Sequence, residues 1–321
     1  MVNNNTASAP LISICIPAYK RAAYLQRLLA SIANQSFKDF EVVVTDDSPD
    51  ESVFDTLQKY QEFFKIKYKK NAAALGTPQN WNEGIRIAEG KWIKIMHDDD
   101  WFASSESLQK FVQLINNNPT ANFLFSGSAF VRNDQVFGGM HISKWQLRLL
   151  KKDPSNLYFK NFIGPPSVTL HLNLKDVWYD PNMKWLVDVD FYMRYLQKHS
   201  SFSYTREPLI NVGYSEDQVT EKVFHDKTIF VKENLMMMQK QPHDILKKIW
   251  NYDYTWRMIR NYKIKNNQEL RELYPAGARN IPAFYTSILD FQKFIPHSVL
   301  KIGVLSKILM ALSFAITRLR K

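Results

Sequence analysis

The chain has little of several residue types that particular protein classes require. It has one cysteine, Cys15, so no intrachain disulfide can form, and we expect a reducing compartment. Its ten glycines form neither GxxxxGK[ST] nor GxGxxG, so a glycine-rich phosphate loop is excluded. The first ten residues are polar and lack the basic-then-apolar pattern of a secretory signal peptide. We therefore expect a cytoplasmic protein.

Positive charge is in excess. The 321 residues contain 42 Lys and Arg against 31 Asp and Glu, a formal net charge of +11. This excess favours an anionic partner such as a nucleotide, a nucleic acid or an acidic lipid, without choosing among them. The length suits a catalytic domain of roughly 200 residues with an appendage. Residues 1–10 are polar and predict a flexible arm.

Strand and helix patterns alternate through the first 115 residues. Apolar runs rich in β-branched residues predict strands within 11–19, 40–50, 65–71 and 91–97. Apolar residues at helical spacing predict helices at 23–35, 52–64 and 78–90, the last capped by Gly90. This order predicts an α/β fold with a mainly parallel central sheet and helices on both faces.

The pattern changes along the rest of the chain. A helix is expected near 188–198, and strands and loops fill the remainder of 116–220. From about residue 221 long helical patterns rich in Lys, Met, Trp and Tyr take over. We therefore predict a domain at 11–220 and a helical C-terminal region at 221–321.

Two groups of acids follow predicted strands. Asp46 and Asp47 come after the second strand, and Asp98, Asp99 and Asp100 after the strand at 91–97. In parallel sheets, ligands bind beyond the carboxyl ends of the strands. Three adjacent carboxylates repel one another, so a cation, hydrogen-bond donors or solvent must compensate them, and Mg²⁺ or Mn²⁺ with a substrate phosphate does so well. The alternatives are a solvated acidic turn and, for the first pair, a turn with a helix cap.

Four segments resemble, in order and spacing, the family-2 inverting glycosyltransferases of GT-A fold. They are ISICIPAYKR, SFKDFEVVVTDDSPDES, NAAALGTPQNWNEGIRIAEGKWIKIMHDDD and DVDFYMR, within about residues 10 to 220. The resemblance implies a GT-A fold, which is Rossmann-like. It implies transfer of a sugar from a nucleotide-diphosphate sugar to a saccharide or lipid-linked saccharide, in surface polysaccharide or glycolipid synthesis. A divalent cation, Mn²⁺ or Mg²⁺, would stabilise the leaving diphosphate.

The resemblance also implies roles for single residues. Asp99 falls on the metal-binding aspartate of the DxD motif, and Asp47 on the acid that reads the nucleotide base. Many members have aspartate where this chain has His97, so Asp98 is the expected first acid, near the ribose or the metal. Further candidates are Pro17 and Tyr19, which line the nucleotide pocket, Asp46, Asp100, and Tyr214, at or near a position where many members have a diphosphate-binding histidine.

The stretch WLVDVDFYMRYL resembles the part of the family that supplies the catalytic base. Asp188 and Arg194 lie six apart there, as in the family's D-x-x-x-x-x-R, so Asp188 is expected to deprotonate the acceptor hydroxyl, with inversion by direct displacement. Asp190 is the alternative base, and both acids could simply favour a helix N-terminus. Residues 161–171 resemble the family's acceptor-side loop, or form an ordinary turn.

The C-terminal residues 301–321 predict an amphipathic helix. It is interrupted by Lys307 and too short to span a bilayer. It can lie on an anionic membrane surface or pack on the catalytic domain. One face carries Val304, Leu305, Ile308, Leu309, Leu312 and Ile316, with Lys307 and Arg318 opposite and Arg320 and Lys321 at the end.

Two other functions would use some of the same features of the sequence. A sugar nucleotidyltransferase would need a triphosphate loop, for which the first strand is followed only by Lys20 and Arg21. A non-catalytic polyanion-binding protein would need a clustered basic surface, whereas the basic residues are dispersed, so no nucleic-acid partner is expected.

No histidine pair has zinc-site spacing, so the histidines at 97, 141 and 171 are expected at the surface or packed.

Overall fold

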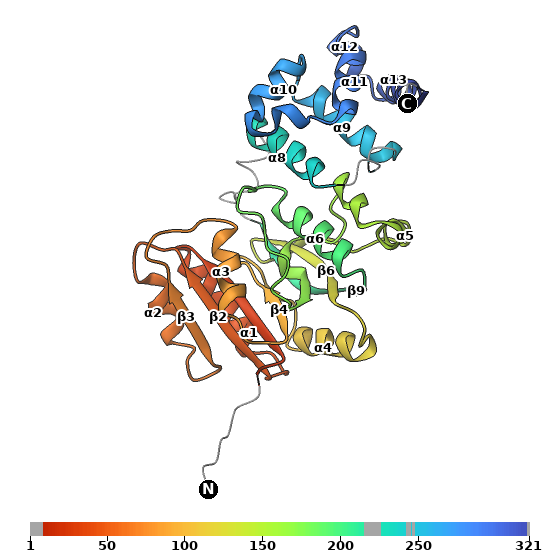
Figure 1. Ribbon diagram of the computed structural model, residues 1–321. Coiled ribbons are helices and arrows are strands. Elements are labelled where there is room, and N and C mark those ends of the chain that lie inside the picture. Colours follow the sequence, from red (N-terminus) through yellow and green to blue (C-terminus); the bar gives the residue numbers. More distant parts are fainter. Residues whose placement is uncertain (1–8, 215–225, 242–244, 246–247, 320–321) are drawn as a thin grey trace. The chain divides into compact units, whose positions relative to one another are not determined.

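The computed structural model describes residues 9–214, 226–241, 245 and 248–319, without the side chains of 278–280, and the chain forms two compact units (Figure 1). The first unit takes 9–151, 162–182 and 187–214 of these residues. The second takes 152–161, 183–186 and the residues from 226 onward.

The first unit is built on a mixed sheet. In the described residues the strand order is β3-β2-β1-β4-β8-β6-β9-β5, with β7 paired to β6. The strands β3, β2, β1 and β4 are parallel, β8 runs antiparallel to β4 and β6, and β9 is parallel to β6. The strands are β1 (Ile12–Ala18), β2 (Phe40–Asp46), β3 (Ile66–Lys70), β4 (Trp92–Ile95), β5 (Trp101–Phe102), β6 (Phe123–Arg132), β7 (Gln135–Met140), β8 (Thr169–Leu172) and β9 (Phe202–Gly213).

Helices cover both faces of the parallel part. The connections β1-α1-β2 and β2-α2-β3 move along the sheet in one direction, and β3-α3-β4 returns in the other. Because such crossovers are right-handed, α1 and α2 lie on one face and α3 on the opposite one, against β1 and β2 (Figure 1). The helices are α1 (Ala22–Ala33), α2 (Ser52–Gln58), α3 (Gln79–Ile87), α4 (Ser107–Asn117), α5 (Lys144–Lys152) and α6 (Val187–Lys198), with a 3₁₀ turn η2 (Pro166–Val168).

This topology fixes where a ligand site can form. The chain direction along the sheet reverses between β1 and β4, which are neighbours. At such a switch point the loops after the two strands diverge and leave a crevice at their carboxyl ends. The loop after β1 contains Lys20 and Arg21, and the loop after β4 contains the three acids Asp98, Asp99 and Asp100.

The core explains the sequence pattern. Both faces of β1 and β2 are covered, so residues such as Ile14 and Val43 are fully buried without alternation. The predicted apolar stripe of α1 is likewise buried, from Leu25 to Ile32. The parallel pairing of β3, β2, β1 and β4 confirms the prediction for the N-terminal half of the sheet, and α6 confirms the helix near 188–198.

Two local predictions are wrong. Gly90 does not cap α3, which ends at Ile87 with Ala88 already extended. Instead, Gly90 lies against β1, where an added Cβ would lie 2.5 Å from the backbone nitrogen of Ser13. The helix expected at 52–64 is α2, which ends at Gln58. The following residues form turns, in which Phe64 packs on Phe40 while Phe63 is 59% exposed.

The second unit is helical. Its elements are η1 (Pro154–Tyr158), α8 (Lys227–Gln239), α9 (Ile249–Asn261), α10 (Asn267–Leu273), η4 (Pro275–Asn280), α11 (Ala283–Gln292), α12 (His297–Leu300) and α13 (Gly303–Leu319). Two short segments from earlier in the chain belong to it. The Tyr158 hydroxyl lies 2.9 Å from that of Tyr285, and Glu233 accepts the backbone N–H groups of 184–186. Across the described residues, none of the helices is both long and apolar enough to traverse a bilayer.

Candidate active site

The acid triplet after β4 is buried at the switch point. The exposed fractions are 4% for Asp98 and 2% for Asp100. Burial raises the pKa of Asp98 to about 7 and that of Asp100 to about 8, since a carboxylate loses its hydration there. The interpretation as a solvated acidic turn is therefore wrong, and the triplet needs compensating groups.

Arg21 is the first compensating group. It has a left-handed backbone conformation, with φ 48°, at the start of α1. Its Nε lies 3.1 Å from Asp98 Oδ2, its Nη2 contacts Asp98 Oδ1, and its Nη1 lies 3.2 Å from Asp99 Oδ2. The loops after β1 and β4 thus meet through one guanidinium, which neutralises part of the acid charge.

A second group has the arrangement of metal ligands. One ligand atom each from His97, Asp99 and Asp100 lies within 4.8 Å of the others. His97 Nε2 is buried without a hydrogen-bond partner, and burial lowers the pKa of this imidazole, so the ring is kept in the neutral form that ligates metals. The structure therefore groups Asp99 with residue 97 and Asp100, while Asp98 is held by Arg21. His97 is also packed, 4.8 Å from the ring of Trp81.

Two residues hold the triplet in place, one through its backbone and one through a side chain. Arg27 Nη2 donates to the carbonyl oxygen of Asp99 over 3.1 Å, and its guanidinium lies 3.7 Å from the centroid of the Trp101 ring. The N–H of Gly213 donates to Asp100 Oδ1 over 3.2 Å. A Cβ at Gly213 would lie 2.3 Å from the carbonyl oxygen of Asp99, so a side chain there is incompatible with this loop.

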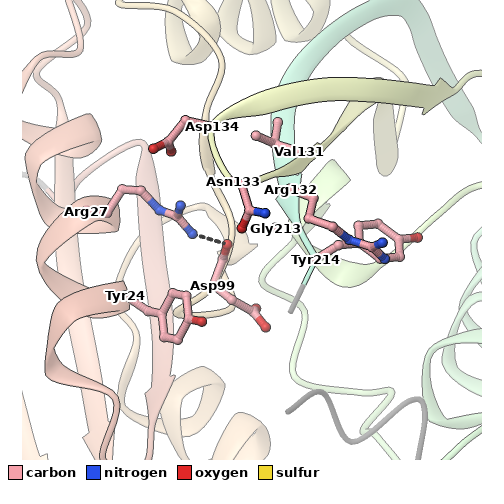
Figure 2. A pocket seen from close by; sticks show the side chains of 9 residues that line it. All are labelled: Tyr24, Arg27, Asp99, Val131, Arg132, Asn133, Asp134, Gly213 and Tyr214. Carbon is pink, nitrogen blue, oxygen red and sulfur yellow. Dashed lines mark hydrogen bonds between the residues drawn. The ribbon is translucent and has the colours of Figure 1, made fainter. Parts of the chain in front are cut away.

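A pocket of about 480 Å³ adjoins Asp99. Figure 2 shows Arg27 on one side, with Asp134 of the β6–β7 turn above it and Tyr24 below, and Arg132 and Tyr214 on the other side. Asn133 and Asp134 form that turn with positive φ. Tyr214, a predicted site residue, is in the wall, whereas 215–220 lie outside the described residues. The lining consists of Tyr24, Arg27, Asp99, Val131, Arg132, Asn133, Asp134, Gly213 and Tyr214.

Lys94 and Ser167 contact each other next to the acid triplet. The Lys94 side chain is fully buried in β4, and burial lowers its pKa to about 7. Its ammonium donates to the carbonyl oxygen of Ser167 and lies 5.0 Å from the Phe111 ring. Ser167 Oγ accepts the N–H of His97 over 3.1 Å. The segment 161–171 therefore lies beside the acid cluster.

Asp46 and Asp47 are engaged by nearby loops. Asp46 is fully buried, with Oδ1 2.8 Å from the Ser48 N–H and Oδ2 2.9 Å from the Tyr68 hydroxyl. Asp47 accepts the backbone N–H groups of Leu75, at 3.0 Å, and Gly76, at 2.8 Å. Asp46 thus stabilises the turn after β2, and Asp47 shapes the loop before α3.

The remaining predicted residues on β1 differ in exposure. Pro17 lies within β1 opposite Thr45 of β2 and is partly buried. Tyr19 follows the end of the strand, and 52% of its surface is exposed. Tyr19 therefore presents a ring to solvent at the same sheet edge as Asp47 and the triplet.

The two acids at the start of α6 have different environments. Asp190 is fully buried, and its Oδ2 lies 2.8 Å from Nε and 2.6 Å from Nη2 of Arg194. Asp188 is only partly buried, and its Oδ1 accepts the N–H of the next residue, Val189, at 2.8 Å. The pKa of Tyr179 is raised well above its usual value by burial and then by the charge of Asp188.

An aromatic chain connects α6 with the acid cluster. The Trp81 ring lies 4.8 Å from that of His97 and 5.1 Å from that of Tyr179. Tyr179 in turn stacks on Phe191 of α6 at 4.1 Å. The start of α6 and the loop after β4 therefore belong to one continuously packed region of the first unit.

Comparison with known proteins identifies the family of the chain. Residues 13–170 match the model of glycosyl transferase family 2. The chain belongs to this glycosyltransferase family. It is 26% identical over 332 residues to the GalNAc(5)-diNAcBac-PP-undecaprenol β-1,3-glucosyltransferase of Campylobacter jejuni, covering 94% of this chain and 99% of that protein. Family membership argues against the nucleotidyltransferase and polyanion-binding alternatives.

Solved structures show that this glycosyltransferase has the GT-A fold. TarS of S. aureus in complex with UDP-GlcNAc aligns with a TM-score of 0.60 at 16% identity, over 88% of this chain and 91% of that one. The mannosyltransferase PcManGT from Pyrobaculum calidifontis, in complex with GDP-Man and Mn²⁺, aligns with a TM-score of 0.55 at 11% identity, over 98% and 88%.

Five residues of the glycosyltransferase site were not predicted from sequence as site residues. They are Arg21, Arg27, Lys94, Ser167 and His97, the last of which was expected at the surface or packed and not in a ligand group. Two of them had a usable signal: a basic residue just after the first strand must face acids that follow a neighbouring parallel strand, and a lysine inside the apolar strand WIKI needs a buried partner. Arg27 and Ser167 had none, because their contacts depend on how distant loops meet.

Proposed function

We propose that this enzyme transfers a sugar from a nucleotide-diphosphate sugar to a hydroxyl of an acceptor saccharide, with inversion and with the help of a divalent cation. The observation that carries the proposal is the buried group of His97, Asp99 and Asp100 at the switch point, with Arg21 at its edge. Such a site suits a metal-bound diphosphate.

The ligand atoms favour Mn²⁺. Two carboxylates supply the oxygen ligands that hard cations prefer, and the unpartnered His97 Nε2 supplies a nitrogen. The structural neighbour PcManGT, which is in complex with GDP-Man and Mn²⁺, is consistent with this choice. When bound, the cation would neutralise the charge that develops on the departing diphosphate.

Arg21 serves as the counter-charge of the acid cluster in the donor-free enzyme. Its side chain is 36% exposed and contacts Asp99, one of the two carboxylates that a cation would use, as well as Asp98. With a cation held at Asp99, Arg21 would be repelled from the carboxylates and would turn toward the diphosphate oxygens. The arginine would thus alternate between the acids and the donor.

The base of the nucleotide binds near Asp47 and Tyr19. Asp47 fixes the loop 71–76 at this edge through Leu75 and Gly76, and the exposed Tyr19 ring offers a stacking surface. Pro17 places the ring at the end of β1. The nucleotide would then lie between the loop after β1 and the loop before α3.

Asp188 acts as the catalytic base. Arg194 neutralises the fully buried Asp190, which leaves Asp188 as the acid of the pair with access to an acceptor. Asp188 takes the proton of the acceptor hydroxyl. The freed oxygen bonds to the anomeric carbon from the face opposite the breaking bond, and the bonding pair leaves with the nucleoside diphosphate. The configuration therefore inverts.

The name of one relative supports a choice of acceptor class. The Campylobacter protein is named for a saccharide carried on PP-undecaprenol. We infer a lipid-linked saccharide as the acceptor here, in surface polysaccharide or glycolipid synthesis at the cytoplasmic side of a membrane. The segment 161–171 beside the acid cluster would contact this acceptor.

Calorimetric titration with a panel of nucleoside diphosphates tests the proposal. One nucleotide should bind in Mn²⁺ and lose its affinity in EDTA and in Asp99→Asn. The variant Asp39→Asn changes an exposed acid away from the site and should bind as the wild type does. Equal binding in EDTA would overturn the metal role, and the absence of binding under all conditions would overturn donor binding itself.

A further inference from the structure

The helix α13 packs in the second unit through polar side chains. Ser313 Oγ lies 2.8 Å from the hydroxyl of Tyr252, and Trp256 Nε1 donates to Ser306 Oγ over 3.0 Å. The buried residues of α13 are Ser306, Met310 and Ser313, against α9 and α11. A helix of a globular protein normally buries its apolar face and exposes its polar one. This helix instead buries two serines and one methionine, and leaves most of its apolar residues exposed.

The exposed side of α13 is apolar. The exposed fractions are 75% for Val304, 53% for Ile308 and 52% for Leu312. These positions recur every four residues and so form a stripe along one side of the helix. We call this stripe the α13 apolar face; it consists of Val304, Leu305, Ile308, Leu312, Ile316 and Leu319. A continuous exposed apolar stripe of this kind marks a binding surface for a protein, a ligand or a membrane.

The charge around the face restricts what can bind. Residues 291–321 contain six Lys and Arg and no Asp or Glu. Lys307 and Arg318 are exposed, and at about 100° per residue they lie beside the face. The expectation that they lie opposite it is wrong, because Ser306, Met310 and Ser313 take that side. A second copy of the chain would bring two positive surfaces together, which is unfavourable. A surface of anionic lipid offers both an apolar layer and negative charge.

We propose that the α13 apolar face inserts into the surface of an anionic membrane, with the helix in the plane of that surface. Side chains such as Ile308 and Leu312 would enter the acyl boundary, and Lys307 and Arg318 would contact lipid phosphates. A crossing of the bilayer is not required, and no described helix could make one. This surface lies in the helical unit, and its function can be tested apart from donor binding.

Sedimentation with lipid vesicles tests the proposal. The wild type should bind vesicles of phosphatidylcholine with about one third phosphatidylglycerol about tenfold more than vesicles of phosphatidylcholine alone, and salt should weaken the binding. The double variant Ile308→Ser with Leu312→Ser should lose about tenfold of this binding. Lys307→Gln with Arg318→Gln should lose most of its salt dependence.

The matched control replaces exposed apolar residues elsewhere. Leu174→Ser with Ile249→Ser removes one leucine and one isoleucine of similar exposure and should bind vesicles as the wild type does. Circular dichroism and nucleotide titration verify that each variant is folded. Equal vesicle binding by the α13 double variant would overturn the proposal. So would a lipid-free dimer of the wild type that becomes monomeric in that variant, since a second copy would then cover the face.

Discussion

Arg21 and Asp98 form a two-point ion pair, with Nε 3.1 Å from Oδ2 and Nη2 against Oδ1. The pair joins the loop after β1 to the loop after β4 at the switch point of the sheet. The same guanidinium also contacts Asp99, so its positive charge lies close to the position at which a cation would bind. The arginine and the cation should therefore compete.

The first prediction concerns Arg21→Ala. Removal of the guanidinium should raise the affinity for Mn²⁺ alone about tenfold, because an attached positive charge no longer opposes the ion. The affinity for a nucleoside diphosphate with Mn²⁺ should fall, because one phosphate ligand is lost. Electron paramagnetic resonance of free Mn²⁺ and calorimetry measure the two constants separately. Lys38→Ala, at an exposed position, is the control. A lower Mn²⁺ affinity in the arginine variant would contradict the competition.

The second prediction compares two glycines. Gly213→Ala should lower the free energy of unfolding by about 1–3 kcal/mol and weaken Mn²⁺ binding, because the added Cβ would lie 2.3 Å from the Asp99 carbonyl oxygen. Gly303→Ala is the matched control, since nothing lies within 4 Å of its added Cβ. Chemical denaturation and Mn²⁺ titration measure both effects. Equal free energies of unfolding and equal Mn²⁺ affinities of the two variants would show that the loop after β4 moves to accommodate the Cβ at little cost.

Much of the parallel half of the sheet could be predicted because its signals are local. Apolar runs place β1 and β2, helical spacing places α1, and a parallel sheet brings the acids after its strands to one edge. The position of Asp99 followed from these rules and from the family resemblance. The direction of each side chain in the triplet did not, because Asp98 and Asp99 are consecutive in a loop and can face different partners.

Other features depend on tertiary packing. Sequence spacing predicted the apolar stripe of α13 but left open whether it packs on the protein. The structure shows that Ser306 and Ser313 face the protein instead, since Trp256 and Tyr252 offer them hydrogen bonds. Gly90 looked like a helix cap, yet its role is a close contact with Ser13 in a strand distant in sequence.

The third prediction separates the two acids of α6. Asp188→Asn should lower kcat about 10²- to 10⁴-fold while donor binding and stability are retained, because only the proton acceptor is removed. Asp190→Asn should instead destabilise the fold by about 3 kcal/mol, because Arg194 loses a buried partner. Turnover assays and thermal unfolding distinguish these results. A stable Asp190 variant with lost turnover, beside an active Asp188 variant, would exchange their roles.

The fourth prediction concerns pH and Lys94. Burial lowers the pKa of Lys94 from 10.5 to about 7. Between these two pKa values the unfolded chain binds a proton at this lysine and the folded protein does not. Stability supplied by this group therefore rises with pH, by about 1 kcal/mol per pH unit. Burial raises the pKa of Asp100 to about 8, which acts in the opposite direction below that value.

The variant Lys94→Met removes this linkage. The free energy of unfolding of the wild type, relative to that of the variant, should increase as the pH rises from about 7 to 10. Lys144→Met, at an exposed position, should show no such trend. Urea denaturation at a series of pH values measures the slopes. A pH-independent difference would mean that Lys94 stays protonated in the folded enzyme, held by the carbonyl oxygen of Ser167 and the carboxylate of Asp100.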